Sequence, residues 1–160
     1  MGIFLIIASI IIVAFTIGAV FGAPWVPAFQ RDLEAVLDDA KLQRGQVFYE
    51  LGCGEGRLLV AAAKRGAIVV GYEINPLLWV VARVRTWRQP NVKVILGDFW
   101  RVDLSNVDLA LAFLVPRYMD RLEKKLAAEM KPGSKFVSYI FDMPHKKPAI
   151  KRHHWQVYEY

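Results

Sequence analysis

The segment Phe48-Tyr49-Glu50-Leu51-Gly52-Cys53-Gly54-Glu55-Gly56-Arg57 decides the fold of this chain. A short apolar run ends in an acid, three glycines follow at alternate positions, and a helix-like stretch begins after them. Alternate glycines allow backbone turns that other residues avoid, and they let the chain pass close beneath a ligand. Because ligands of α/β sheets bind beyond the carboxyl ends of the strands, the segment predicts a strand, a ligand-binding loop and a helix.

The residues around the glycines narrow the kind of ligand. A dinucleotide-binding loop needs a third small residue where this chain has Arg57, and no Gly-Lys-Ser/Thr follows as in a nucleoside triphosphate loop. Glu50, directly before the loop, would repel a pyrophosphate but would attract a positively charged amino group. S-adenosylmethionine carries an amine, a sulfonium and a ribose, and therefore fits this loop.

Two further loops stand at corresponding places after the next two apolar runs. Gly71-Tyr72-Glu73-Ile74-Asn75 offers a carboxylate that can accept hydrogen bonds from both ribose hydroxyls. Gly97-Asp98-Phe99-Trp100 offers a carboxylate for an adenine amino group and an aromatic ring to cover the base. The predicted S-adenosylmethionine site comprises Glu50, Gly52, Cys53, Gly54, Gly56, Glu73, Ile74, Asn75, Asp98, Phe99 and Trp100.

Outward from these loops, short apolar runs alternate with helix-like stretches. Buried strands separated by helices are typical of a mainly parallel sheet covered on both faces, with right-handed crossovers. We therefore predict a Rossmann-like, doubly wound α/β domain over residues 46–160. The predicted strands are Val47–Leu51, Ile68–Tyr72, Val92–Leu96, Val107–Phe113, Lys135–Phe141 and Trp155–Tyr160, and the predicted helices are Arg57–Arg65, Pro76–Arg88 and Arg117–Met130. Met143–His154 is expected to be a soft, irregular segment.

The first thirty residues carry no charged side chain. Ile3 to Gly22 has sixteen apolar residues out of twenty, long enough at about 1.5 Å per residue to cross the hydrocarbon core of a bilayer. No basic residue precedes this run, and it is longer than the apolar core of a cleaved signal peptide. We predict a transmembrane anchor over residues 1–23, followed by an amphipathic connecting helix within 24–45 that covers the domain or lies along the membrane.

The flanking residues predict the orientation of the anchor. Arg31, Lys41 and Arg44 follow the apolar run and no basic residue precedes it, so the domain is expected on the cytoplasmic side. Gly18 and Gly22 have the spacing that lets two membrane helices approach closely, which predicts a weak homodimer as one alternative.

These motifs together resemble a known family. The chain is similar to the membrane-anchored protein lysine methyltransferases of mitochondria, which modify the c-type rotor protein of ATP synthase and the adenine nucleotide translocase. The resemblance covers nearly the whole chain and is carried by the glycine loop, Gly71–Pro76, Asp98-Phe99-Trp100, Val115-Pro116 and Leu122-Glu123-Lys124-Lys125-Leu126. It implies a class I, S-adenosylmethionine-dependent methyltransferase that acts on a membrane-protein lysine, in the inner mitochondrial membrane if the source is eukaryotic.

The chain also departs from the patterns of related enzymes. Ala28 stands where the family has a hydroxyl residue, and the C-terminal end is short. Phe113-Leu114-Val115-Pro116 replaces the Asp/Asn-Pro-Pro-Tyr with which adenine and glutamine methylases bind their acceptors. We therefore predict no nucleic-acid substrate, and we attribute the net charge of +6 to a cytoplasmic membrane face.

Lysine methylation depends mainly on positioning a deprotonated amine in line with the methyl–sulfur bond. Aromatic walls accept both the amine and its methylated, cationic forms. The predicted pocket residues are Phe113, Pro116 and Tyr118, with Phe99, Trp100 and Tyr139 as further wall residues. No general base can be named from the sequence, and methylation of a lipid or quinone head group and a non-catalytic cofactor-binding module both stay open.

The remaining reactive side chains predict no further chemistry. Cys53 is the only cysteine and has no histidine partner, so we expect a small residue that fits the loop. The three histidines lie in a basic C-terminal stretch without a third convergent ligand, so we predict no metal site there. A solvated basic face or contact with anionic lipid are the two alternatives for that stretch.

Overall fold

The computed structural model describes residues 2, 4, 5, 9 and 32–160. Its centre is a seven-stranded sheet in the order β3-β2-β1-β4-β5-β7-β6. The elements are α2 (Leu33–Asp39), β1 (Val47–Leu51), α3 (Arg57–Lys64), β2 (Ile68–Glu73), α4 (Pro76–Thr86), β3 (Val92–Leu96), η1 (Phe99–Arg101), β4 (Leu109–Ala112), η2 (Pro116–Tyr118), α5 (Met119–Glu129), β5 (Lys135–Tyr139), β6 (Ile150–Lys151) and β7 (Trp155–Glu159).

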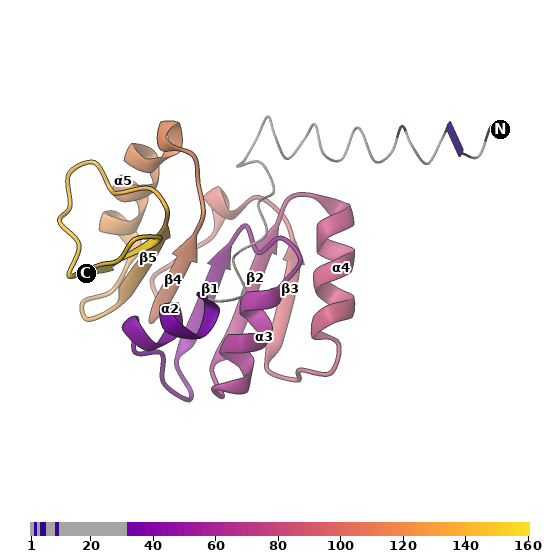
Figure 1. Cartoon of the computed structure of the whole chain (residues 1–160), viewed down its shortest axis with the longest axis horizontal. Coiled ribbons are helices and arrows are strands. Elements are labelled where there is room, and N and C mark those ends of the chain that lie inside the picture. The colour runs from indigo at the N-terminus through magenta and orange to yellow at the C-terminus, as the bar shows by residue number, and fades with distance from the viewer. Residues whose placement is uncertain (1, 3, 6–8, 10–31) are drawn as a thin grey trace.

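The sheet is parallel from β3 to β5, and only β7 and β6 run antiparallel to their neighbours. Helices α2, α3 and α4 pack through one buried cluster on one face, and α5 packs through a second cluster on the opposite face (Figure 1). The predicted Rossmann-like, doubly wound and mainly parallel fold is therefore confirmed.

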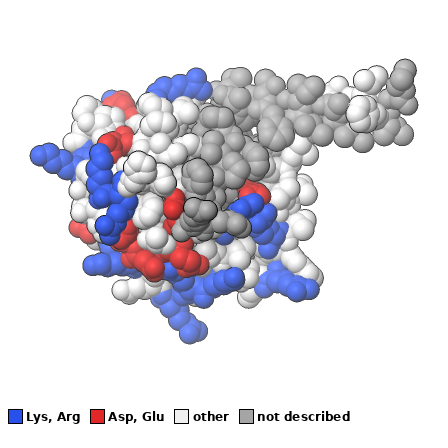
Figure 2. Space-filling model, viewed as in Figure 1, with Lys and Arg blue, Asp and Glu red and all other residues white. Residues whose placement is uncertain are grey.

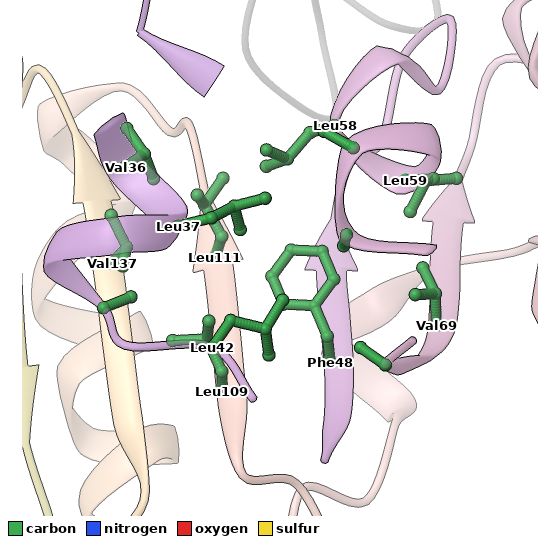
Figure 3. Close-up of a cluster of buried hydrophobic side chains, with 14 of the residues drawn as sticks. Val36, Leu37, Leu42, Phe48, Leu58, Leu59, Val69, Leu109, Leu111 and Val137 are labelled. Atoms are coloured by element: carbon green, nitrogen blue, oxygen red, sulfur yellow. The ribbon is translucent and has the colours of Figure 1, made fainter. Parts of the chain in front are cut away.

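Buried apolar side chains explain why these segments form the sheet. All four residues of β4 are buried, which is typical of a central parallel strand covered on both faces. Phe48 of β1 is fully buried and lies between Leu37 and Leu42 on one side and Val69 on the other (Figure 3). Truncation of such a side chain leaves a cavity and costs about 3–5 kcal/mol, so Phe48 anchors α2 to the sheet.

The described part of the predicted connecting helix covers the sheet. Val36 and Leu37 of α2 are buried in the same cluster as Phe48. Arg65, which follows α3, forms ion pairs with Glu34 at 2.6 Å and Asp38 at 2.8 Å. Helix α2 is therefore attached to the domain by apolar contacts and by charged ones.

Several predicted boundaries differ from the structure. The strand predicted over Val107–Phe113 is shorter, as β4, and the one predicted over Lys135–Phe141 ends with β5 at Tyr139. The helix predicted from Arg117 begins with the short 3-10 helix η2, so α5 starts at Met119. The segment predicted to be irregular contains β6, because Ile150 and Lys151 pair with β7.

The predicted anchor, Ile3 to Gly22, lies almost entirely outside the described residues. Within the described part of the chain, no helix is long and apolar enough to cross a bilayer. The pairing predicted through Gly18 and Gly22 also falls on residues that the structure does not describe.

Charged side chains do not gather on one part of the domain face shown in Figure 2. Lys and Arg lie around its outline, and acidic side chains lie among them. The described residues on this face form no single basic patch of the kind that tracks a nucleic-acid backbone.

Candidate functional site

The glycine loop connects the end of β1 to the start of α3. Gly52, Gly54 and Gly56 all have positive φ angles, of 89°, 54° and 77°, which is why the sequence places glycine at alternate positions. The backbone N–H groups of Gly52 and Cys53 donate hydrogen bonds to the carbonyl oxygen of Tyr72, at 2.9 and 2.8 Å. The loop is thereby held against β2, and a side chain added at Gly52 would enter open space.

Cys53 is packed inside the loop and is not poised for chemistry. Its side chain is buried, and burial together with the nearby Glu50 and Glu73 raises the pKa of the thiol well above its usual value. Its sulfur would lie 2.9 Å from a Cβ at Gly71, so it fills the space between the loop and β2. A neutral, buried thiol is a poor nucleophile.

Glu50 ends β1 as a buried carboxylate that needs a partner. Its side chain is 8% exposed, and no donor among the described residues reaches Oε2. Burial, and secondarily the charge of Glu73, raises the pKa of Glu50 well above its usual value. An unpaired buried carboxylate is costly, and a bound ammonium group would supply the missing charge and hydrogen bonds.

Glu73 ends β2 beside the same loop. Its Oε2 accepts a hydrogen bond from the Gly54 N–H, and its Oε1 accepts one from the Asn75 N–H, both at 2.8 Å. Burial raises the pKa of Glu73, and these backbone hydrogen bonds partly oppose the rise. Each carboxylate oxygen has a second lone pair, so a ribose hydroxyl can still bind to either one.

Asn75 caps the helix that follows. Its Oδ1 accepts hydrogen bonds from the N–H groups of Leu77 at 2.9 Å and Leu78 at 3.4 Å, and its side chain is buried. Asn75 therefore fixes the start of α4, while Ile74 beside it is half-buried. The predicted cofactor contacts of Ile74 and Asn75 stay predictions.

Asp98 follows β3 and caps η1. Its Oδ1 accepts a hydrogen bond from the Trp100 N–H at 3.0 Å, which leaves Oδ2 for another donor. The rings of Phe99 and Trp100 lie 4.8 Å apart, and both pack against the cluster on the α5 face. The Arg121 guanidinium lies 4.0 Å from the Trp100 ring, which helps to hold that ring in place.

The predicted wall residues fall into two groups on the two faces of the sheet. Tyr118 lies 6.1 Å from Trp100 and packs with it on the α5 face. Phe113 lies 6.2 Å from the ring of Tyr139 and packs on the α2 face. Pro116 is exposed at the start of η2, between the end of β4 and α5. The structure therefore brings the predicted residues to the carboxyl edge of the sheet, but not into one ring of contacts.

Sequence analysis missed a polar group beside Phe113. The Tyr139 hydroxyl donates a hydrogen bond to Asp32 Oδ2 at 2.6 Å, and His154 Nδ1 lies 3.0 Å from the same oxygen. The ring of Phe141 stacks on Phe113 at 6.2 Å. These contacts join residues more than 100 positions apart, so no local spacing could have predicted them.

Comparisons with known proteins agree with this geometry. Residues 50–150 match the family model described as the ANTKMT methyltransferase domain. The chain is 38% identical over 128 residues to the ATP synthase c-protein lysine N-methyltransferase of Rattus norvegicus, covering 78% of this chain and 59% of that protein. It is 36% identical over 130 residues to the adenine nucleotide translocase lysine N-methyltransferase of Mus musculus, covering 79% of this chain and 56% of that protein.

A solved structure is similar over nearly all of its length. An RNA methyltransferase from Salinibacter ruber, in complex with S-adenosyl-L-homocysteine, superimposes with a TM-score of 0.76 at 29% identity, covering 83% of this chain and 91% of that chain. The chain spans between half and two thirds of the length of the rat and mouse relatives. The resemblance found in the sequence is confirmed.

Proposed function

Because this chain belongs to the ANTKMT methyltransferase domain family, we propose that it is a protein-lysine N-methyltransferase that acts on a membrane protein. The cofactor of this family is S-adenosylmethionine. The observation that carries the proposal is the buried Glu50 carboxylate, whose Oε2 has no donor among the described residues and which lies beside an open glycine loop. Such a group requires a cationic ligand, and the amino group of S-adenosylmethionine is one.

The three strand ends have separate roles toward the cofactor. Glu50 binds the amino group, Glu73 accepts hydrogen bonds from the ribose hydroxyls, and Asp98 Oδ2 accepts one from the adenine amino group. The support for these roles is the unpartnered Oε2 of Glu50, the spare lone pairs of Glu73, and the second oxygen of Asp98. The positive φ angles of the loop glycines keep side chains out of the space that the ligand would enter.

Methyl transfer then asks little more of the protein than positioning. The cofactor supplies a methyl group on a positively charged sulfur. The acceptor lysine must lose a proton, after which its nitrogen lone pair forms a bond to the methyl carbon while the carbon–sulfur bond breaks. Phe113, held by Tyr139 and Phe141, provides an aromatic wall that excludes water and tolerates the cationic product.

The membrane is the proposed meeting place of enzyme and substrate. The relatives named above are enzymes for the c protein of ATP synthase and for the adenine nucleotide translocase. The apolar run from Ile3 to Gly22 supports a single-pass anchor with the domain on the cytoplasmic side, or in the inner mitochondrial membrane if the source is eukaryotic. Tethering in the same layer raises the effective concentration of the acceptor lysine.

Other acceptors are rivals that an experiment can separate. RNA is one, because the similar solved structure is named an RNA methyltransferase. However, the loop after β4 reads Phe113-Leu114-Val115-Pro116, without the Asp/Asn-Pro-Pro-Tyr that binds an adenine amine. A lipid or quinone head group is a second rival, and cofactor binding without catalysis is a third.

The test incubates the full chain with methyl-labelled S-adenosylmethionine and native membranes from its source. We expect the label in a protein band that survives lipid extraction and ribonuclease treatment. Label in the lipid extract or in RNA would replace the proposed substrate, and no transfer at all would favour a non-catalytic module. A chain without residues 1–23 should still bind S-adenosylhomocysteine but should label the same band far more slowly, whereas equal rates would contradict the role of the anchor.

A further inference from the structure

Helix α4 is apolar on both of its sides. Ala82 is fully buried and faces the sheet cluster. Val80, Val84 and Trp87 are 49%, 66% and 72% exposed. At about 100° per residue these three lie within about 60° of one another and on the side opposite Ala82. A helix that is apolar all round is ordinarily covered on every side, so the outer stripe of α4 lacks a cover in the isolated domain.

Only basic side chains accompany this stripe. Between Glu73 and Asp98 the sequence has no Asp or Glu, whereas it has four basic residues: Arg83, Arg85, Arg88 and Lys93. By the same helical spacing, Arg83 and Arg88 lie on the two flanks of the stripe. Arg85 turns toward the glycine loop, where its guanidinium pairs with Glu55 at 2.9 Å.

Trp87 has the environment of an aromatic residue at a membrane interface. It is the most exposed of the apolar side chains at α4, and the Arg88 guanidinium lies 4.8 Å from its ring. An apolar stripe with an indole in it and arginines on both flanks is the pattern of helices that lie in the head-group layer of a bilayer. Anionic lipid head groups attract such arginines.

We propose that the outer face of α4, defined by Val80, Val84 and Trp87 with Arg83 and Arg88, lies against the head-group layer of an anionic bilayer. The inference rests on the proposed membrane location, and it adds the surface through which the domain contacts lipid. A second copy of the chain fits the stripe less well. In a twofold contact the flanking arginines of the two copies would approach one another, and like charges would oppose the pairing.

Chain length places the domain within reach of the lipid. Ten residues, from 23 to 32, separate the predicted anchor from α2, and even a fully extended segment of that length spans at most about 35 Å. The contact also constrains the candidate site, because α4 begins at Pro76, three residues after Glu73. A helix of 11 residues is about 16 Å long, so a helix lying flat on the bilayer keeps the Glu73 edge of the sheet close to it.

The experiment uses the full chain reconstituted in vesicles of phosphatidylcholine and phosphatidylglycerol, with an environment-sensitive fluorophore on single introduced cysteines. Val84→Cys reports the outer face of α4, Ala128→Cys reports the exposed side of α5, and Val13→Cys reports the predicted anchor. The unlabelled background is the native chain, whose only cysteine is buried. Lipids with a spin label in the acyl chain quench a fluorophore that contacts them.

We expect several-fold quenching at positions 84 and 13 and none at position 128. Quenching at 13 without quenching at 84 would overturn the α4 contact and leave the anchor intact, whereas quenching at 84 alone would support the contact and refute the anchor. Equal quenching at 84 and 128 would mean that the domain meets lipid on no defined face, and would overturn the proposal. Shielding of position 84 in detergent without lipid would show that a second copy covers it, and would also overturn the proposal.

Charge reversal tests the part of the proposal that concerns anionic lipid. In the Val84→Cys background, Arg83→Glu together with Arg88→Glu should reduce quenching several-fold. Lys124→Glu, on the exposed side of α5, is the matched control and should leave quenching unchanged. An unchanged signal after the double reversal would contradict the role of the two arginines.

Discussion

The backbone N–H of Gly54 donates a hydrogen bond to Oε2 of Glu73 at 2.8 Å, which joins the middle of the glycine loop to the acidic end of β2. The same carboxylate accepts the N–H of Asn75, which caps α4. Glu73 therefore shapes the loop, the helix start and the proposed ribose site at once. A change at this residue is expected to affect ligand binding more than its exposed area would suggest.

The first prediction concerns that carboxylate. Glu73→Ala removes an ionised acceptor of backbone and ribose donors, and charge-assisted hydrogen bonds contribute about 1.5–3 kcal/mol each. We expect the dissociation constant for S-adenosylhomocysteine to rise by tenfold or more in calorimetric titration. Glu159→Ala, at the exposed end of β7, is the control and should bind as the native chain does. Unchanged affinity in the Glu73 variant would refute the ribose assignment.

The second prediction concerns pH and Glu50. Burial raises the pKa of Glu50 in the folded chain, so the folded state binds a proton that the unfolded state releases at lower pH. The stability associated with the neutral carboxyl is present at low pH and is lost as pH rises through the raised, folded-state pKa. Binding of an ammonium ligand needs the ionised carboxylate, so affinity for S-adenosylhomocysteine should rise over the same interval.

Glu50→Gln separates the two effects. Above the folded-state pKa of Glu50, thermal melts should show a more stable ligand-free variant, because the unpaired buried charge is gone. Its affinity for S-adenosylhomocysteine should be lower at the same pH, and less dependent on pH. A variant that is less stable than the native chain across the whole range would contradict the assignment of an unpaired carboxylate.

The third prediction tests the packing beneath the loop. A Cβ at Gly71 would lie 2.6 Å from Cδ1 of Leu59 and 2.9 Å from the sulfur of Cys53. Because Leu59 is fully buried, it has little room to move, and Gly71→Ala should lower the free energy of unfolding by about 1–3 kcal/mol. Gly97→Ala is the control, since its Cβ would meet nothing closer than 3.9 Å. Equal denaturation midpoints for the two variants would contradict the close contact.

The fourth prediction separates the acceptor wall from the cofactor site. Phe113→Ala removes the ring that Tyr139 and Phe141 hold. Methyl transfer should fall by about tenfold or more through lost positioning, while affinity for S-adenosylhomocysteine stays within about twofold. Tyr139→Phe keeps the ring but loses the hydrogen bond to Asp32, so it should lower stability more than it lowers the rate. A parallel loss of rate and cofactor affinity in Phe113→Ala would place this ring at the cofactor instead.

The sequence was sufficient to predict the carboxyl edge of the sheet because parallel neighbours bring strand ends together. Glu50 pairs in register with Gly71 of β2 and with Leu111 of β4, and Glu73 pairs with Leu96 of β3. Three strand-end loops in order along the chain were therefore expected to converge. The exact ends of β4 and β5 were not predictable, because their apolar runs continue beyond the last paired residue.

Contacts between distant segments could not be predicted in the same way. The hydrogen bond from Tyr139 to Asp32 joins residues 107 positions apart, and it depends on how α2 docks on the sheet. The pairing of Ile150 with Val157 is too short to leave a period-two pattern in the sequence. The apolar outer stripe of α4 is not predictable either, because a sequence pattern does not say which of two apolar sides of a helix faces the sheet.

The central claim is that the three strand ends form one site for S-adenosylmethionine, and calorimetric titration of the full chain tests it most directly. The account predicts saturable binding of one S-adenosylhomocysteine per chain, with no saturable binding of NADH or ATP under the same conditions. Absence of saturable heat with S-adenosylhomocysteine, or binding of the dinucleotide in its place, would contradict it.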